Sequence, residues 1–345
     1  METAWFIIVT LMLAMYVVLD GFDFGVGMIY PFVARTETER QTALTSIGPV
    51  WNANEVWLIA AAAVLFCAYP KAYAAGFSGF YLALILVLWL LIFRGLAVEL
   101  RAQIDHVLWK QAWDMAFTTS SALLAIVFGT ALGNLIRGVP LNGDGYFFVP
   151  FWTDFRPGSA PGILDWFTLL LGLTSAVILA FHGANYLVMK TEGLLYQRAV
   201  SAAWMLGWAS AGCTALTVIA VPLVQLNLSL NFARHPVVYL APAIGVIALG
   251  YSLYFRLYRR DISAFLASCV YIFLMLVSVM FGMYPYILVS TTDVTLSLTV
   301  FNAATDSYGL TAGIGWFGGG ALLILIYQIY LYFQFYGKIR SDDAH

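Results

Sequence analysis

Ionisable and amide side chains interrupt the long apolar stretches of this sequence, and their types define the chemistry that can take place there. The deepest of them are Asp20, Asp23, Asn52, Glu55, Arg94 and His182. An ionised group in lipid is costly, so each charge needs a partner, a water-filled cavity or a neutral form. Carboxylates and histidine exchange protons, and amides can hold water molecules between them. These residue types therefore indicate buried ion pairs or a hydrated proton path.

Two explanations of these residues stay open. Asp20 or Asp23 can pair with Arg94, which would neutralise buried charge and fix the register of two helices. Alternatively, the carboxylates pass protons. Glu55 is then the best candidate, because no basic residue lies within one helical turn of it along the chain. His182 is either a further proton carrier or a hydrogen-bonded core histidine.

Nothing in the sequence has the spacing of a metal or haem site. The three cysteines lie inside apolar runs, without C-x-x-C or C-x-x-C-H, and we interpret them as buried structural thiols. The four histidines are His106, His182, His235 and His345. Only His182 lies deep in an apolar stretch, and no second haem ligand accompanies it. We therefore predict no metal site and no catalytic residue in this chain, and we assign no cofactor to it.

The glycine-rich run GFDFGVG, residues 21–27, does not indicate a nucleotide site. It follows no strand and lacks the G-x-G-x-x-G pattern of a dinucleotide-binding turn. Gly21 and Gly25 instead form G-x-x-x-G, a pattern that lets two membrane helices approach closely. We predict tight helix packing at these two glycines.

The composition places these residues in a bilayer. Of 345 residues, 62% are hydrophobic and 10% are charged, whereas soluble domains carry about a quarter charged residues. Apolar stretches of roughly 20 residues recur, which is the length that crosses the hydrocarbon core as a helix. The net charge of −2 provides no basic surface for nucleic acid. The N-terminal stretch has no basic segment and no cleavage site of the signal-peptide type, so we interpret it as a retained first span.

We predict an all-α, polytopic membrane protein of about nine transmembrane helices, organised as two four-helix groups plus one extra helix. The predicted spans are 4–33, 49–69, 75–98, 115–136, 162–189, 199–226, 236–257, 262–288 and 311–336. No charged or proline-rich linker divides the chain, so we expect residues 1–345 to form a single integral membrane domain.

Lysine and arginine sort to one side of these nine spans. Eleven of them lie in the segments after spans 1, 3, 5 and 7 or in the C-terminal tail, and four lie in the segments on the opposite side. Cytoplasmic loops are enriched in these two residue types. We therefore predict a cytoplasmic C-terminus and a periplasmic N-terminus.

Several motifs of the chain resemble subunit II of cytochrome bd-type ubiquinol oxidases. The resemblance is strongest in the first hundred residues and extends over nearly the whole chain. The segments that carry it are LDGFDFGVGMIYPF (19–32), TERQTALTSIGPVWNANEVWLIAAAAVLFCAYPKAYAAGFSGFY (38–81), FRGLAVELR (93–101), FGTALGNLIRGVP (128–140), and MYPYILVS with TLSLTVFNAATDSYGLT (283–311).

The resemblance implies a heterodimer in the bacterial inner membrane. The partner would be a haem-bearing subunit I that carries haems b558, b595 and d and the quinol-oxidising loop. The complex would oxidise quinol, reduce dioxygen to water, and build proton motive force by taking protons from the cytoplasm without pumping. This subunit would hold no haem, although some members of the family bind a structural quinone in it. The resemblance also allows small accessory membrane subunits in the complex.

The resemblance also assigns roles to single residues. Asp23 and Arg94 match family positions that are tied to a proton route at the interface with subunit I. Asn52 and Glu55 depart from the pattern, because some relatives carry an aspartate after Trp51 and an amide at the position of Glu55. We infer that the carboxylate has moved by one helical turn, from 52 to 55. The short chain, which lacks a longer outer insertion, is similar to the cyanide-insensitive branch.

Two other functions compete with the oxidase subunit. A secondary transporter would show clear internal repeats and paired broken helices at mid-membrane, whereas these polar residues gather toward one side. A purely scaffolding membrane subunit would use the same residues only to join helices. We expect an oxidase subunit that supports assembly of subunit I and gives protons access near Glu55.

Overall fold

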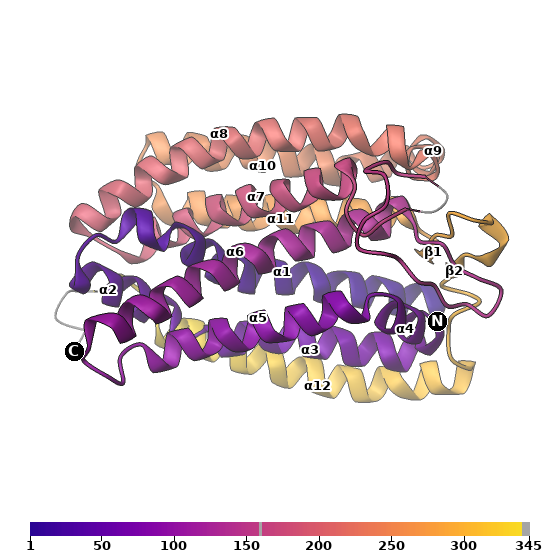
Figure 1. Cartoon of the computed structure of the whole chain (residues 1–345), viewed down its shortest axis with the longest axis horizontal. Helices are drawn as coiled ribbons and strands as arrows, with labels where there is room; N and C mark the ends of the chain where they lie inside the picture. The colour runs from indigo at the N-terminus through magenta and orange to yellow at the C-terminus, as the bar shows by residue number, and fades with distance from the viewer. Residues whose placement is uncertain (159–160, 340–345) are drawn as a thin grey trace.

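The computed structural model describes residues 1–158 and 161–339, so His345 and Arg340 lie outside the described residues. Long helices dominate these ranges (Figure 1). Nine helical segments are long and apolar enough to cross a membrane. Eight are single α-helices: α1 (Glu2–Val33), α3 (Trp51–Ala68), α5 (Tyr81–Leu100), α6 (Val107–Arg137), α7 (Trp166–Lys190), α8 (Gly193–Val224), α11 (Asp261–Met283) and α12 (Ser307–Gln334). The ninth joins the short 3-10 helix η1 (Pro236–Tyr239) to α10 (Leu240–Leu257). The prediction of an all-α, nine-span protein is confirmed.

Shorter elements connect these spans at the two ends of the bundle. They are α2 (Glu37–Ile47), α4 (Pro70–Gly79), α9 (Leu226–Arg234), the 3-10 helix η2 (Val294–Leu296), and the two antiparallel strands β1 (Tyr286–Leu288) and β2 (Leu298–Thr299). Helix α4, helix α9 and the two strands lie at the end of the bundle that holds the N-terminus, whereas α2 lies at the opposite end (Figure 1). We call these the N-terminal end and the α2 end.

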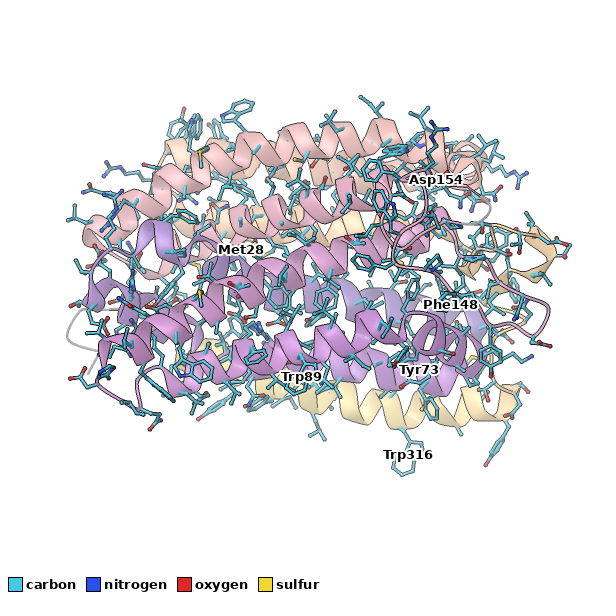
Figure 2. The ribbon with its side chains drawn as sticks, viewed as in Figure 1. Met28, Tyr73, Trp89, Phe148, Asp154 and Trp316 are labelled. Atoms are coloured by element: carbon cyan, nitrogen blue, oxygen red, sulfur yellow. The ribbon has the colours of Figure 1, made fainter. Side chains whose placement is uncertain are left out.

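The spans form two groups that pack on each other mainly through α1 and α6 on one side and α7 and α11 on the other. Helices α3 and α6 pack against α1, and α5 packs against α6, whereas α8 and α11 pack against α7 and α10 packs against α11. Helix α12 lies along the outside, next to α3 (Figure 1). It is the least buried span, and Trp316 points away from the bundle there (Figure 2). This arrangement corresponds to the predicted two four-helix groups plus one helix.

A pair of glycines lets α1 and α7 approach closely. A Cβ atom added at Gly25 would lie 2.0 Å from the carbonyl oxygen of Leu179, and one added at Gly183 would lie 2.2 Å from the carbonyl carbon of Gly25. Backbone therefore faces backbone at this crossing, which only glycine permits. The predicted role of Gly25 in tight packing is confirmed, and Gly183 is its partner. At Gly21 an added Cβ would meet the side chain of Leu179 at 2.8 Å.

The substitution Gly183→Ala should destabilise the bundle by about 1–3 kcal/mol or more, because the new methyl group can be accommodated only by separating two central helices. Thermal unfolding of the purified chain in detergent, followed by tryptophan fluorescence, measures the change. Gly212→Ala in α8 is the matched control, since nothing lies within 4 Å of its Cβ position. Equal melting temperatures for the two variants would contradict the close approach of α1 and α7.

Several predicted span boundaries differ from the ends of the helices, and α8, for example, begins at Gly193 and not at 199. The predicted span 75–98 is divided, because α4 ends at Gly79 and α5 begins only at Tyr81. The predicted span 262–288 is too long, since α11 ends at Met283, two residues before Pro285; proline lacks an N–H and restricts the residue before it. The predicted span 115–136 is too short. Helix α6 begins at Val107, because a helix can continue out of the membrane through polar residues.

Candidate functional site

Arg94 of α5 lies at the centre of a buried ion cluster between α1, α3 and α5. Its Nη1 atom donates to Asp20 Oδ1 at 2.5 Å, and its Nη2 atom lies 3.5 Å from Glu55 Oε2. The side chains of Arg94 and Asp20 are 2% and 0% exposed. Of the two aspartates proposed as partners for Arg94, the structure selects Asp20. Glu55 has no basic neighbour within one turn of α3, but Arg94 reaches it from α5, a contact that sequence distance cannot show.

Asp23 belongs to a second branch of the same cluster. Asn54 donates from Nδ2 to Asp23 Oδ2 at 2.9 Å. The amide oxygen of Asn54 in turn accepts from Gln328 Nε2 at 2.9 Å and from the hydroxyl of Tyr332 at 3.0 Å. Helix α12 thus contributes two polar groups to the site, and Asp23, Asn54 and Gln328 are all buried. The structure brings Asp20, Asp23, Glu55 and Arg94 to one region of the bundle, as the sequence predicts.

Several buried polar atoms of this cluster have no hydrogen-bond partner among the described residues. They are Asp20 Oδ2, Asp23 Oδ1, Arg94 Nε, Gln328 Oε1 and the hydroxyl of Tyr16. An unsatisfied buried polar atom costs about 1–3 kcal/mol, so such atoms are rare and concentrate where water or a reactant is bound. Water molecules can satisfy such atoms where the site is polar.

Aromatic rings enclose the guanidinium of Arg94. The ring of Phe24 lies 4.7 Å from its central carbon, and the ring of Trp51 lies 6.0 Å from it. Trp51 also contacts Gly95, where an added Cβ would lie 3.0 Å from the indole ring, and it donates to Glu99 at 3.3 Å. A cation over an aromatic face is stabilised by the ring quadrupole. These contacts fix Arg94 in one position between its two carboxylate partners.

Glu55 and Asn52 lie at the edge of the cluster with different surroundings. The Glu55 side chain is 20% exposed while its carboxylate approaches Arg94. The Asn52 side chain is exposed and makes no hydrogen bond with residues 1–158 or 161–339. Position 55 therefore directs its side chain toward the ion cluster, whereas position 52 directs its side chain outward. The role of either residue in proton transfer stays a prediction.

His182 of α7 lies apart from this cluster. Its Nδ1 atom is 2.7 Å from the hydroxyl of Ser268, its Nε2 atom is 3.0 Å from the carbonyl oxygen of Val18, and its ring stacks on Phe265 at 5.0 Å. No hydrogen bond joins it to Asp20, Asp23, Glu55 or Arg94 within the described ranges. Both ring nitrogens have partners, so this arrangement corresponds to the hydrogen-bonded core histidine and leaves neither nitrogen directed at a haem iron.

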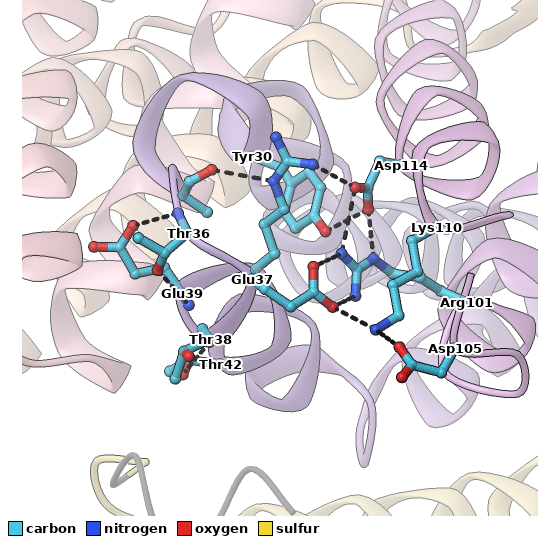
Figure 3. Close-up of polar contacts among 12 residues, drawn as sticks. Tyr30, Thr36, Glu37, Thr38, Glu39, Thr42, Arg101, Asp105, Lys110 and Asp114 are labelled. Carbon is cyan, nitrogen blue, oxygen red and sulfur yellow. Dashed lines mark hydrogen bonds and ion pairs between the residues drawn. The ribbon is translucent and has the colours of Figure 1, made fainter. Parts of the chain in front are cut away.

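A second ion cluster lies at the α2 end of the bundle (Figure 3). Asp114 of α6 is its centre: it accepts from Arg101 Nε and from the hydroxyl of Tyr30, both at 2.5 Å, and from Arg40 Nη1 at 2.7 Å. Arg101 also forms two parallel hydrogen bonds to Glu37, at 3.0 and 2.9 Å. This cluster joins α1, α2, α5 and α6, and we call it the Asp114 cluster.

The Asp114 cluster predicts a pH-dependent contribution to stability. The hydrogen bonds from Arg101 lower the pKa of Glu37 from 4.5 to about 2. Because the folded-state pKa is lowered, the contribution is complete above pH 4.5 and is lost as the pH falls toward about 2. In Glu37→Gln this component of the pH dependence should disappear. Since the Glu37 side chain is 53% exposed, the loss of stability at pH 7 should stay below about 1 kcal/mol. Melting temperatures recorded from about pH 6 to about pH 3 measure both effects.

Sequence reasoning missed the residues that complete the clusters from distant spans. In the sequence, Gln328 and Tyr332 lie more than 200 residues after the other members of the buried cluster. A glutamine inside the apolar run ILIYQIYLYF was the available signal for the first. Within residues 1–158 and 161–339, no group of three or more histidine, cysteine, aspartate or glutamate side chains could hold a metal ion.

The bundle and its buried charges define a multi-pass membrane protein with an ion cluster inside its spans. The family described as cytochrome bd terminal oxidase subunit II matches residues 1–335. The cytochrome bd-I ubiquinol oxidase subunit 2 of Escherichia coli (strain K12) is 31% identical over 366 aligned positions, which cover 98% of this chain and 95% of that protein. The cytochrome bd ubiquinol oxidase subunit 2 of Bacillus subtilis (strain 168) is 29% identical and covers 98% and 97%.

The fold agrees with these sequence matches. A chain of the bd oxidase from Geobacillus thermodenitrificans superposes with a TM-score of 0.73, at 16% identity, over 96% of this chain and 97% of that chain. The chain belongs to the cytochrome bd terminal oxidase subunit II family. It is thus a subunit of an oxidoreductase complex, and the family implies a subunit I as its partner.

Proposed function

We propose that this chain is the haem-free core subunit of a cytochrome bd-type quinol oxidase, which supports assembly of the haem-bearing subunit I and gives protons access from the cytoplasm. The complex couples quinol oxidation to the reduction of dioxygen to water without pumping protons. The observation that carries the proton proposal is the buried cluster, in which Glu55 lies at a partly exposed edge and Asp20 lies behind Arg94.

The geometry supports a short proton route through this cluster. Glu55 and Asp20 contact the same guanidinium, so a proton taken up at Glu55 changes the charge balance that Asp20 experiences. Unsatisfied oxygens on Asp20 and Asp23 are acceptors that water molecules can bridge. Asn54 connects Asp23 to α12 by hydrogen bonds. We place proton uptake at Glu55 and assign Asn52 and His182 no direct contact with this route.

The partner is proposed to cover part of the surface formed by α3, α5 and α12. Glu55 is partly exposed and Asn52 and Glu99 are exposed on these helices, and polar or ionisable groups in spans do not face lipid without cost. We place haems b558, b595 and d on subunit I, since His182 has no free nitrogen for iron. A structural quinone in this chain and small accessory membrane subunits remain part of the family expectation, as does the cyanide-insensitive subtype.

The proposed orientation follows from the basic residues at the α2 end. Helix α2, the α10–α11 turn and the end of α12 lie there, and they belong to the segments in which lysine and arginine are concentrated (Figure 1). We therefore place the α2 end in the cytoplasm and the N-terminal end in the periplasm of a bacterial inner membrane. With this orientation the partly exposed Glu55, in the first turns of α3, lies near the cytoplasmic side.

Replacing Glu55 with glutamine tests the proton proposal in the complete complex. The variant should lower quinol-driven oxygen consumption and proton uptake by about tenfold or more, because an amide cannot release a proton. Glu192→Gln is the matched control, since Glu192 is an exposed glutamate that precedes α8, away from α3 and α5. Unchanged rates in Glu55→Gln, with normal assembly, would contradict the proton route and indicate that the chain acts as a scaffold. A reduced-minus-oxidised spectrum of the purified complex tests the oxidase role separately, since absence of haem would contradict it.

A further inference from the structure

A basic cavity of about 510 Å³ lies at the α2 end, away from both ion clusters. The end of α7, the turn between α10 and α11, and the segment after α12 form its wall. Four cationic residues line it: Lys190, Arg259, Arg260 and Lys338. Among the described residues, Asp261 is the one acidic residue in the lining, and it lies 3.2 Å from Arg256 Nη1, which does not line the cavity. The described lining therefore carries an excess of positive charge.

The four cations have no carboxylate partner within the described ranges. Lys190 Nζ donates to the carbonyl oxygen of Phe335 at 2.5 Å, and Lys338 Nζ lies 4.8 Å from the ring centroid of Tyr196. These contacts position the two ammonium groups without neutralising them. Arg259 and Arg260 are exposed and form no ion pair with residues 1–158 or 161–339. The N-terminus of α11, which no side chain caps, adds partial positive charge.

Arg259 has an unusual backbone conformation. Its φ angle is +55°, in the left-handed region where glycine or asparagine is preferred. The turn that ends α10 requires this conformation, since Arg260 N bonds to the carbonyl oxygen of Phe255. A glycine would form the same turn without strain. The turn alone does not favour an arginine at position 259, and this arginine adds a positive charge there.

An apolar groove continues from the basic cavity along α10 and α11. It has a volume of about 460 Å³, and Ser263 lines both spaces. Its walls are mainly aliphatic and include Ile244, Ile247, Leu266, Ala267 and Val270. The charged cavity at the ends of α10 and α11 and the apolar groove between these helices thus meet at Ser263.

We infer that the basic cavity and the adjoining groove bind one anionic phospholipid, with its phosphate headgroup among Arg259, Arg260, Lys190 and Lys338 and an acyl chain between α10 and α11. Basic pockets at the ends of membrane helices recognise anionic headgroups through charge. The groove distinguishes a lipid from a free phosphate, which has no apolar part to bury. The cations distinguish it from a neutral quinone. This inference does not depend on the proton route through Glu55.

Native mass spectrometry of the purified complex with added phosphatidylglycerol, phosphatidylcholine or glycerol 3-phosphate tests the site. We expect phosphatidylglycerol to bind at least about tenfold more tightly than phosphatidylcholine, and Arg259→Gln/Arg260→Gln to lose that preference. Lys71→Gln/Arg156→Gln is the matched control: it removes two exposed cations from the N-terminal end and should leave binding within about twofold. Ala267→Phe, which fills the groove, should weaken phosphatidylglycerol but not glycerol 3-phosphate.

Three results would overturn the inference. Equal binding of phosphatidylcholine and phosphatidylglycerol would show that charge does not select the ligand. Unchanged binding in Arg259→Gln/Arg260→Gln would place the lipid elsewhere. Glycerol 3-phosphate bound as tightly as phosphatidylglycerol, together with no effect of Ala267→Phe, would identify a phosphate site and not a lipid site. The variants change exposed or groove-lining residues, and the melting temperature of each reports whether it folds.

Discussion

Replacing Arg94 with leucine should destabilise the protein by about 3–5 kcal/mol and abolish assembly of the active complex. The substitution removes the cation from Asp20, whose side chain is 0% exposed, and leaves a carboxylate that must either stay ionised without a partner or take up a proton. It also removes the contact with Glu55 and the cation over Phe24. Thermal unfolding of the purified chain and oxygen consumption of the complex measure the two effects.

The double variant Arg94→Leu/Asp20→Asn separates buried charge from packing. Neutralising Asp20 should recover a large part of the stability lost in Arg94→Leu, because the uncompensated charge is then absent. Asp20→Asn alone should also be destabilising, since it leaves Arg94 with only the longer 3.5 Å contact to Glu55. Additive losses in the double variant would mean that Asp20 and Arg94 are not coupled. The pair would then contribute through shape alone.

The sequence was sufficient to predict the membrane fold, because hydrophobic length is a local property. Helix α1 needs only its own residues to be recognised as a span, and nine such segments follow from composition and length. Gly25 was recognised for the same reason, since the G-x-x-x-G pattern lies within one helix. Its partner Gly183 lies on another span, and only the packing of α1 on α7 identifies it.

The composition of the site was less predictable, because ion pairs form between helices. The choice of Arg94 as the partner of an aspartate in α1 was correct, since few cations lie deep in the spans. The absence of a basic residue within one turn of Glu55 along α3 did not exclude an ion pair, because Arg94 reaches Glu55 from α5. Gln328 was missed because its amide acquires significance only when α12 lies against Asn54. Sequence thus identified which residues are exceptional, and the packing determines which of them meet.

The two ion clusters differ in what their geometry allows. In the buried cluster, four oxygens and one nitrogen have no hydrogen-bond partner among the described residues, and Glu55 connects the cluster to its surroundings. In the Asp114 cluster, both carboxylate oxygens of Asp114 accept hydrogen bonds from positively charged residues. The first arrangement suits proton exchange, whereas the second suits a permanent connection between helices.

Replacing Asp114 with leucine should therefore destabilise the chain by about 3–5 kcal/mol, the second large effect that we expect. Asp114 is the shared acceptor of Arg101, Arg40 and Tyr30, and Arg101 is 1% exposed. Without the carboxylate, Glu37 of α2 is the remaining ion-pair partner of Arg101 among the described residues, and the connection from α6 to α1 and α5 is lost (Figure 3). Protein yield after size-exclusion chromatography and the melting temperature measure the loss.

Asp105→Leu is the matched control for Asp114→Leu, because Asp105 belongs to the same network through Lys110 but its side chain is 97% exposed. An exposed ion pair contributes about 0–1 kcal/mol. The melting temperature of this variant should therefore lie within roughly a few degrees of that of the unmodified chain. The contrast depends on burial and not on the number of ion pairs at the α2 end. Similar losses in the two variants would contradict that argument. A stable, assembled Asp114→Leu complex would show that α2, and not Asp114, holds this end of the bundle together.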